Sequence, residues 1–206
     1  MQTDGLRYAG EVITWRPLLI AAAGSIVITA TARQGEAFPL QASAILLGAA
    51  AAFALDDPMF EILGASPTSL ARRRATRLAV VLTPIVVFWM ALVIWHGNRS
   101  SAASLTLTTM FTGLLSLGFG ISGIAGRRSQ GRGGPVAAPA ILAALIVSGL
   151  LPTRWRPLPL GDVPGGFATI RARWALAAVV GVFALVVSSR DLAGRRRQAA
   201  RPAMND

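Results

Sequence analysis

The chain has 206 residues, of which 53% are hydrophobic and only 14% are charged, and its mean hydropathy is +0.57. Several apolar runs approach the ~20 residues that an α-helix needs to cross a bilayer, so the composition excludes an ordinary soluble domain and predicts an all-α, polytopic membrane protein. The net charge of +11 would suggest nucleic-acid binding in a soluble protein. Here most arginines flank apolar runs, where membrane topology and anionic lipid explain them better, so we expect no nucleic-acid partner.

The residue types that are missing exclude several kinds of chemistry. Cysteine is absent, which excludes disulfides, thiolate nucleophiles and thiolate metal sites. All 20 basic residues are arginine, so no lysine can bind phosphate in a Walker A loop or form a Schiff base. The single histidine, His96, is interpreted as a wet residue at the membrane interface rather than a ligand. We therefore expect no catalytic site, no metal and no cofactor in this chain.

The first apolar run predicts a membrane span over residues 15–32. It ends in Thr-Ala-Thr-Ala, which faintly resembles a signal-peptidase site. Because such a leader would be unusually long and would contain Asp4 and Glu11, we favour an uncleaved span. After a tight turn, the second span is predicted over residues 38–55. It is rich in alanine, with Gly48 near its middle, and small residues of this kind allow helices to approach closely.

Residues 56–77, DDPMFEILGASPTSLARRRATR, have the pattern of a helical hairpin. Asp57 and Pro58 form a helix start, because a carboxylate accepts unpaired N–H groups and the fixed φ of proline suits the first helical position. A short apolar helix follows and ends at Gly64; its apolar residues are Met59, Phe60, Ile62 and Leu63. A Ser-Pro pair repeats the start signal, and a second helix carries four arginines into the next apolar run: Arg72, Arg73, Arg74 and Arg77.

Two interpretations of this hairpin remain open. It is either a helix that docks into a partner protein or a cytoplasmic loop whose apolar residues lie in the headgroup layer. In the docking interpretation, Phe60, Ile62 and Leu63 are the buried anchors and the arginines form a polar rim. The neighbouring carboxylates are interpreted as helix caps rather than metal ligands, since further ligands are missing: Asp56, Asp57 and Glu61.

The third span is predicted over residues 78–95 and the fourth over residues 105–125. The fourth carries small and hydroxyl residues on one broad helical face: Thr109, Thr112, Gly113, Ser116, Gly120 and Gly123. This face is either a helix-packing seam, with hydroxyls bonded to nearby carbonyls, or a weakly polar substrate path through Thr109, Thr112 and Ser116. We favour the packing interpretation.

The last third of the chain contains two more expected spans, over residues 135–151 and 174–189. Between them, residues 152–170 are rich in proline and glycine, and we expect an interfacial or partly re-entrant segment there. Residues 190–206 form a basic tail. With six spans, both termini and the hairpin lie on one side, which holds fourteen of the 20 arginines, so the positive-inside rule makes that side cytoplasmic.

None of the six expected spans has an ionisable residue near its centre. This argues against proton-coupled transport and against intramembrane proteolysis. Six spans, a short cytoplasmic helix between the second and third, and the DDPMFEILGASPTSLARRRATRL stretch together resemble the permeases of ABC-2 type exporters. The stretch is similar to small permease subunits of actinobacterial ABC transporters. The resemblance covers the whole chain as architecture and this one stretch at the level of residues.

The resemblance implies a partner and an energy source. In that family the helix between spans two and three couples to a separate ATPase chain, which carries the ATP and magnesium. It also implies a second permease copy or a sister permease and a place in the bacterial cytoplasmic membrane. The coupling role falls on Asp57, Pro58, Met59, Phe60, Glu61, Ile62 and Leu63, with Arg72, Arg73 and Arg74 as the rim.

We expect an amphipathic or lipid-like substrate, because the spans are apolar with scattered hydroxyls. The main alternative is a structural or accessory subunit of a larger membrane complex, with no transport activity of its own. A membrane enzyme acting on lipids is less favoured, because the chain lacks a cluster of polar catalytic residues.

Overall fold

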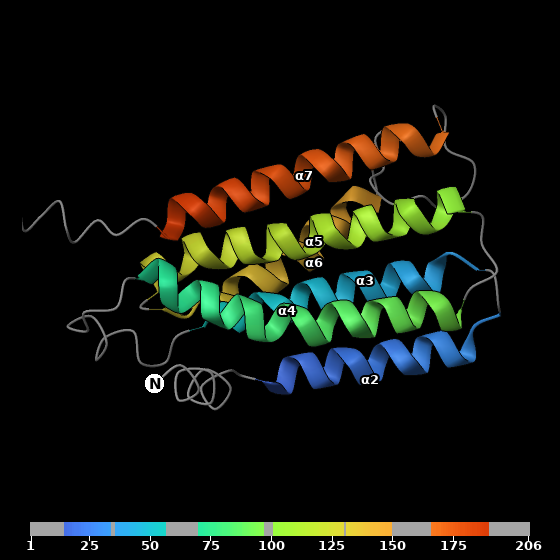
Figure 1. The fold of residues 1–206 in the computed structure, drawn as a ribbon, viewed down its shortest axis with the longest axis horizontal. Helices are drawn as coiled ribbons and strands as arrows, with labels where there is room; N and C mark the ends of the chain where they lie inside the picture. Colours follow the sequence, from blue (N-terminus) through green and yellow to red (C-terminus); the bar gives the residue numbers. More distant parts are fainter. Residues whose placement is uncertain are drawn as a thin grey trace, which may run out of the picture.

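The computed structural model describes residues 15–33, 36–56, 70–96, 101–129, 131–149 and 166–189. In these ranges the chain forms α-helices and one 3-10 helix: α2 (Trp15–Thr31), α3 (Phe38–Ala51), η1 (Ala52–Leu55), α4 (Leu70–Trp95), α5 (Ser101–Arg128), α6 (Gly134–Gly149) and α7 (Gly166–Ser189). Figure 1 shows an elongated bundle in which successive α-helices run in opposite directions. We call the end at which α4 begins and α7 ends the basal end, and the opposite end the distal end.

Four of the described helices are long and apolar enough to cross a membrane: Phe38–Leu55, Arg74–Trp95, Ala102–Arg128 and Gly166–Ser189. They correspond to the second, third, fourth and sixth expected spans. The other two apolar helices, Trp15–Thr31 and Gly134–Val147, are shorter. The all-helical architecture is confirmed and is consistent with a membrane protein, whereas the number of six spans stays a prediction.

The helices extend further than the apolar runs suggested. α4 is one continuous helix from Leu70, which confirms the prediction that the basic helix runs into the third span. α7 begins at Gly166, and residues 166–170, expected in the interfacial segment, belong to its first turns. Arg171 and Arg173 therefore lie within a helix rather than in a loop. Long side chains of this type can extend toward water from a helix end, so the helix need not stop where charge begins.

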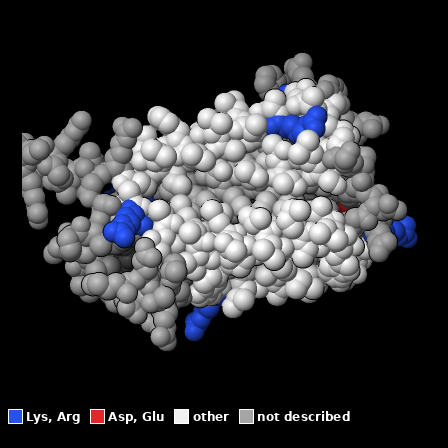
Figure 2. Space-filling model, in the orientation of Figure 1, with Lys and Arg blue, Asp and Glu red and all other residues white. Residues whose placement is uncertain are grey.

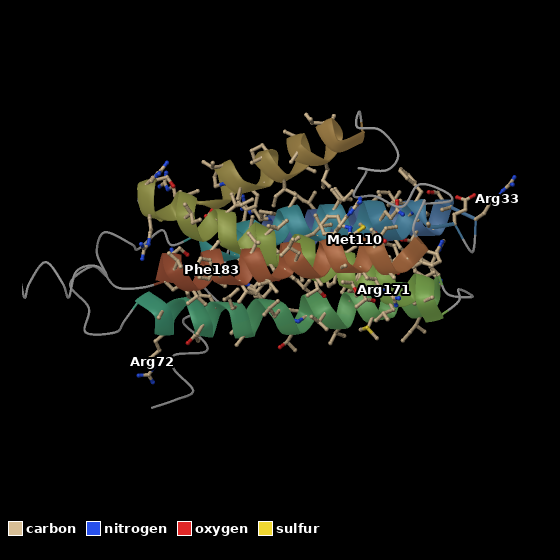
Figure 3. The ribbon with its side chains drawn as sticks, turned by 90° about the horizontal axis from the view of Figure 1, so that it is seen from above. Arg33, Arg72, Met110, Arg171 and Phe183 are labelled. Atoms are coloured by element: carbon tan, nitrogen blue, oxygen red, sulfur yellow. The ribbon has the colours of Figure 1, made fainter. Side chains whose placement is uncertain are left out.

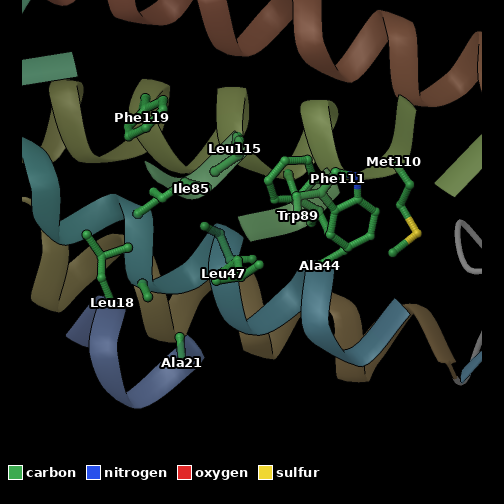
Figure 4. Close-up of a cluster of buried hydrophobic side chains, with 14 of the residues drawn as sticks. Leu18, Ala21, Ala44, Leu47, Ile85, Trp89, Met110, Phe111, Leu115 and Phe119 are labelled. Atoms are coloured by element: carbon green, nitrogen blue, oxygen red, sulfur yellow. The ribbon is translucent and has the colours of Figure 1, made fainter. Parts of the chain in front are cut away.

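The apolar core lies among α2, α3, α4 and α5. Figure 4 shows side chains from these four helices converging: Leu18, Ala21, Ala44, Leu47, Ile85, Trp89, Met110, Phe111, Leu115 and Phe119. Trp89 and Phe111 stack with ring centroids 4.4 Å apart and planes inclined by 10°. Such a stacked pair contributes about 0.5–1.5 kcal/mol beyond the burial of its area.

His96 is buried, which corrects the expectation of a wet interfacial histidine. Its side chain is only 3% exposed. The ring nitrogen Nε2 lies 3.2 Å from the backbone carbonyl oxygen of Glu36, at a polar contact between the end of α4 and the residues before α3. The sequence correctly predicted that His96 lies at the end of a span. It could not show that the ring contacts a backbone carbonyl from another part of the chain.

Charged residues lie near the two ends of the bundle. Figure 2 shows a face without charged residues across its middle and with arginines toward both ends. Arg72 and Arg33 lie at opposite ends in Figure 3. This distribution leaves an apolar belt of the kind that lipid tails surround.

Candidate functional site at the basal end

The predicted coupling residues lie outside the described part of the chain: Asp57, Pro58, Met59, Phe60, Glu61, Ile62 and Leu63. The structure instead describes the residues on either side of residues 57–69. Asp56 follows the end of η1, and Leu70 begins α4. Asp56 and, four residues after Leu70, Arg74 belong to a set of contacts at the basal end. We call this set the basal junction: Asp56, Arg74, Arg77, Gly123, Arg127, Gly134 and Ser188.

Asp56 caps a helix that is distant in the sequence. Its carboxylate oxygen Oδ1 accepts a hydrogen bond of 2.7 Å from the backbone N–H of Gly134, the first residue of α6. The first N–H groups of a helix have no partner within the helix, so a carboxylate there satisfies a donor and complements the positive helix end. The expectation that Asp56 caps a helix is confirmed for α6, which begins far along the chain.

Arg77, in α4, also binds Asp56. Its guanidinium donates a hydrogen bond of 2.6 Å to the backbone carbonyl of Asp56. The pKa of Asp56 is raised above its ordinary value of 3.8, because burial of the carboxyl outweighs the N–H donors at Gly134 and Gly133 and the nearby arginines Arg132 and Arg77. Asp56 is thus tied to α4 and α6 at once.

Arg74 joins α4 to α5 and α7. The side chain is only 7% exposed. Its Nη1 donates to the carbonyl oxygen of Ser188 at 2.8 Å and lies 3.0 Å from the hydroxyl oxygen of the same residue, while its Nη2 donates to the carbonyl oxygen of Gly123 at 3.2 Å. The carbonyl of Ser188 also accepts a hydrogen bond of 2.6 Å from Nε of Arg127. Two arginines thus satisfy a carbonyl at the C-terminal end of α7, where cations complement the helix dipole.

The three arginines expected on a partner-facing rim are not equivalent. Arg72 is exposed and lies at the basal end in Figure 3. Arg74 is buried in the bundle, not on an exposed rim. Arg73 lies between them in α4. The role of these residues in binding a partner stays a prediction.

The small-residue face of α5 packs against α7. A Cβ added at Gly120 would lie 2.6 Å from the carbonyl oxygen of Gly181, and one added at Gly113 would lie 2.7 Å from Cε3 of Trp174. A Cβ at Gly181 would collide with the backbone of Ser116. Helices in this close contact need glycine at the crossing points. The seam that the sequence suggested for this face is therefore present.

The hydroxyls of Thr109 and Thr112 on this face bond within their own helix. Thr109 donates to the carbonyl of Leu105 at 2.7 Å, and Thr112 donates to the carbonyl of Thr108 at 2.9 Å. This is the hydroxyl-to-carbonyl bonding that the packing interpretation expected. A substrate path through Thr109, Thr112 and Ser116 stays a prediction.

The described residues contain no group of three or more histidine, cysteine or acidic side chains that could hold a metal ion. At the basal end, arginine, carboxylate and backbone groups connect the helices through hydrogen bonds. Comparison of the chain with models of protein families, with curated proteins and with solved structures found no match.

Proposed function

We propose that the chain is the membrane-spanning permease subunit of an ATP-driven exporter of the ABC-2 type. A separate ATPase chain binds residues 57–69 from the cytoplasm and supplies the energy. The substrate is amphipathic or lipid-like. The proposal joins the resemblance of the DDPMFEILGASPTSLARRRATRL stretch to the contacts at the basal junction.

The observation that carries the proposal is the anchoring of both flanks of residues 57–69. On one flank, Asp56 is bonded to Arg77 of α4 and to Gly134 of α6. On the other, Arg74 connects the first turns of α4 to Ser188 at the end of α7. A displacement applied to residues 57–69 would therefore reach several helices directly. A loop that only rests on lipid has no need of such anchoring.

The distribution of charge supports an external energy source. Among the described residues, the buried ionisable side chains are Arg74 and Arg77 at the basal end and His96 at the distal end. A proton-driven carrier needs an ionisable group near the middle of the membrane. The described helix centres offer hydroxyl and apolar side chains instead, which supports an energy source in a partner chain.

Affinity purification from native membranes in mild detergent tests the proposal. We expect the tagged chain to bring down a protein with ATPase activity, and we expect Phe60→Asp combined with Leu63→Asp to abolish the association. Phe38→Asp is the matched control, because Phe38 is an exposed phenylalanine at the distal end and its replacement should leave the complex intact. Recovery of folded chain without an ATPase, under several detergents and after crosslinking in the membrane, would refute the proposal.

A structural or accessory subunit is the second candidate. The observation that favours it is the apolar outer face of α7, which is exposed and suits lateral docking as well as lipid: Leu176, Val179, Val180, Phe183 and Val186. In that case the co-purifying partner lacks a nucleotide site, and the Phe60 and Leu63 substitutions leave the association unchanged.

A further inference from the structure

A strip of α5 is open to the outside between α4 and α7. On one side of the strip, Phe111 stacks on Trp89 of α4; on the other, a Cβ added at Gly113 would lie 2.7 Å from Cε3 of Trp174 in α7. Thr112, which lies between these two contacts on the helix, is exposed. The strip is therefore the floor of a groove whose walls are α4 and α7, and we call it the α4–α7 groove. Figure 2 shows the face of the molecule that contains α4 and α7 hollowed along its middle.

The α4–α7 groove is closed at its basal end. There Arg74 of α4 donates to the carbonyl oxygens of Ser188 in α7 and Gly123 in α5. The open part of the floor runs from the exposed Leu105 to the half-buried Ser116, which is about 17 Å at ~1.5 Å per residue. One leaflet of a bilayer has about 15 Å of hydrocarbon, half of the ~30 Å core. An acyl chain from the leaflet at the distal end therefore matches the groove in length.

The floor accommodates hydrocarbon although threonines line it. The hydroxyl of Thr109 donates to the carbonyl oxygen of Leu105 at 2.7 Å, and the hydroxyl of Thr112 donates to the carbonyl oxygen of Thr108 at 2.9 Å. Both hydroxyl donors are thus satisfied within α5. An acyl chain that covers them leaves no unpaired donor, so the usual cost of burying a polar group is avoided.

Arg171 lies at the edge of the α4–α7 groove, toward its distal end. α5 and α7 run in the same direction, and the contact of Gly113 with Trp174 sets their relative levels. Arg171, three residues before Trp174, is therefore level with Met110. Figure 3 shows Arg171 on the side of α7 nearer to α4. Arg173 is rotated by about 200° around the same helix, which places it on the opposite side of α7.

The guanidinium of Arg171 makes no hydrogen bond or ion pair with another described residue, and the side chain is half-buried. It lies five residues, about 8 Å, beyond the first residue of α7, a helix long and apolar enough to cross a membrane. A charged side chain at this depth must reach water or meet an anion. The phosphate of a lipid headgroup lies near the membrane surface, and its oxygens accept paired hydrogen bonds from a planar guanidinium.

We propose that the α4–α7 groove binds an anionic phospholipid from the leaflet at the distal end, with the lipid phosphate on Arg171 and an acyl chain along α5. The charge of the guanidinium complements the phosphate, and the length and satisfied hydroxyls of the floor suit the chain. No partner protein takes part in this contact, so the lipid site is independent of the proposed function.

Lipid retention tests the binding preference. The chain is reconstituted into equal parts of phosphatidylglycerol and phosphatidylcholine and extracted in mild detergent, and native mass spectrometry counts the lipids that remain bound. We expect the unsubstituted chain to retain phosphatidylglycerol, whose headgroup is anionic, in preference to phosphatidylcholine. Arg171→Gln should weaken that retention about tenfold, as for the loss of a hydrogen bond to a charged group. Arg171→Lys keeps the charge and should retain part of the preference.

Arg173→Gln is the matched control, because it removes the same charge two residues later on the opposite side of α7. It should retain phosphatidylglycerol as the unsubstituted chain does. Equal retention of the two lipids, or an equal loss in Arg171→Gln and Arg173→Gln, would overturn the inference, since the arginines would then attract lipid through general charge alone. Inorganic phosphate should not displace the lipid; displacement would identify a site for a free anion and would also overturn it.

The position of the acyl chain is measured by crosslinking. A phosphatidylglycerol with a photoreactive group in its acyl chain should crosslink to Thr112 and Ser116 in the groove, and to Phe183 on the outer face of α7, which is 67% exposed. Arg171→Gln should reduce the crosslinks in the groove and leave those at Phe183 unchanged. Crosslinks that persist in the groove of this variant, or that fall equally at both places, would contradict a lipid held by Arg171.

Discussion

At the basal junction, the buried Arg74 and Arg77 and the half-buried Asp56 each meet a backbone group at the end of a helix or in a turn. Arg74 donates to the end of α7, Arg77 donates to the carbonyl of Asp56, and the carboxylate of Asp56 accepts from the start of α6. Burial of a charge is costly unless it is hydrogen-bonded, and hydrogen bonds to charged groups are stronger than neutral ones. The same residues therefore stabilise the helix ends and connect the helices.

Replacing Arg74 with lysine should destabilise the bundle although the charge is kept. A lysine has a single ammonium group and cannot reach Ser188 and Gly123 together as the guanidinium does. We expect a loss of about 1–3 kcal/mol in the free energy of unfolding, because hydrogen bonds from a buried, charged donor are lost.

Denaturant or thermal unfolding in detergent measures the effect of Arg74→Lys. Arg72→Lys is the matched control: it lies on the same helix, its side chain is exposed, and its effect should stay within about 0.5 kcal/mol. Equal effects of the two substitutions would show that the contacts of Arg74 contribute nothing to stability.

Asp56 should make the stability of the folded chain depend on pH. Its pKa is raised above 3.8 in the folded chain, mainly by burial, so the folded state binds the proton more tightly than the unfolded state. The contribution of this group to stability is therefore fully present below pH 3.8 and is lost as the pH rises through the raised pKa. Asp56→Asn removes this titration while keeping a side-chain oxygen near Gly134.

The comparison of unfolding midpoints between pH 7 and about pH 4 checks this sign. The unsubstituted chain should gain stability relative to Asp56→Asn as the pH falls. A relative loss on acidification would mean that the hydrogen bond from Gly134 and the arginines outweigh burial, and that the pKa is lowered.

At the scale of elements, α5 and α7 form a closely packed pair that depends on glycine. The neighbours of Gly181 are backbone atoms of Ser116 and Leu117, which cannot move aside as a flexible side chain can. Gly181→Ala should therefore separate the two helices and destabilise the fold by about 1–3 kcal/mol, as overpacking does in other cores.

Gly24→Ala is the control for this substitution. The nearest atom to its Cβ would be Cδ1 of Leu46 at 3.5 Å, an ordinary contact, so the gain in helix propensity should dominate. Thermal unfolding in the same detergent compares the two variants. If Gly181→Ala proved as stable as Gly24→Ala, the packing of α5 against α7 would not depend on glycine at this position.

Sequence periodicity predicted the helices, but it did not predict which helices pack against one another. The apolar runs identified the helices, and the small residues of α5 marked its packing face, because helical spacing decides which side chains share a face. Spacing cannot tell which helix covers that face, and Trp174 and Gly181 of α7 became visible as its partners only in the fold. Some helix ends also differ from the predicted ends. α7 begins at Gly166 rather than at residue 174, because charged residues do not end a helix.

The sequence predicted that a carboxylate at the basal junction caps a helix, but it did not predict which helices the junction connects. The Asp-Pro dipeptide is a local helix-start signal, so the sequence assigned the capping role of the carboxylates to the helix that directly follows. Asp56 caps α6, a contact across 78 positions that no local pattern encodes. The helix predicted directly after it lies outside the described residues. The sequence predicted Arg74 to be one of several arginines on a partner-facing rim. Its acceptors at Gly123 and Ser188 lie on helices distant in the sequence, so no local pattern indicates them.

At the scale of the whole molecule, an apolar belt separates two polar ends. The basal end carries the arginines of α4 and the C-terminal arginines of α5, and Arg33 lies at the distal end. The excess of arginine predicts that the basal end faces the cytoplasm.

Single cysteines in the otherwise cysteine-free chain test this orientation. Glu36→Cys and Ala71→Cys place thiols at exposed positions at the distal and basal ends. A membrane-impermeant maleimide should label position 36 in intact cells and position 71 only after permeabilisation. The reverse pattern would place residues 57–69 outside the cell and remove the proposed ATPase from reach.

In the proposed exporter, energy enters through residues 57–69. The most direct measurement places a photo-crosslinking amino acid at position 60 and activates it in native membranes, with position 38 as the distal control. We predict a crosslink from position 60 to an ATP-binding protein and none from position 38. Crosslinks from position 60 to lipid alone would contradict the account and would identify this segment as a loop lying in the headgroup layer.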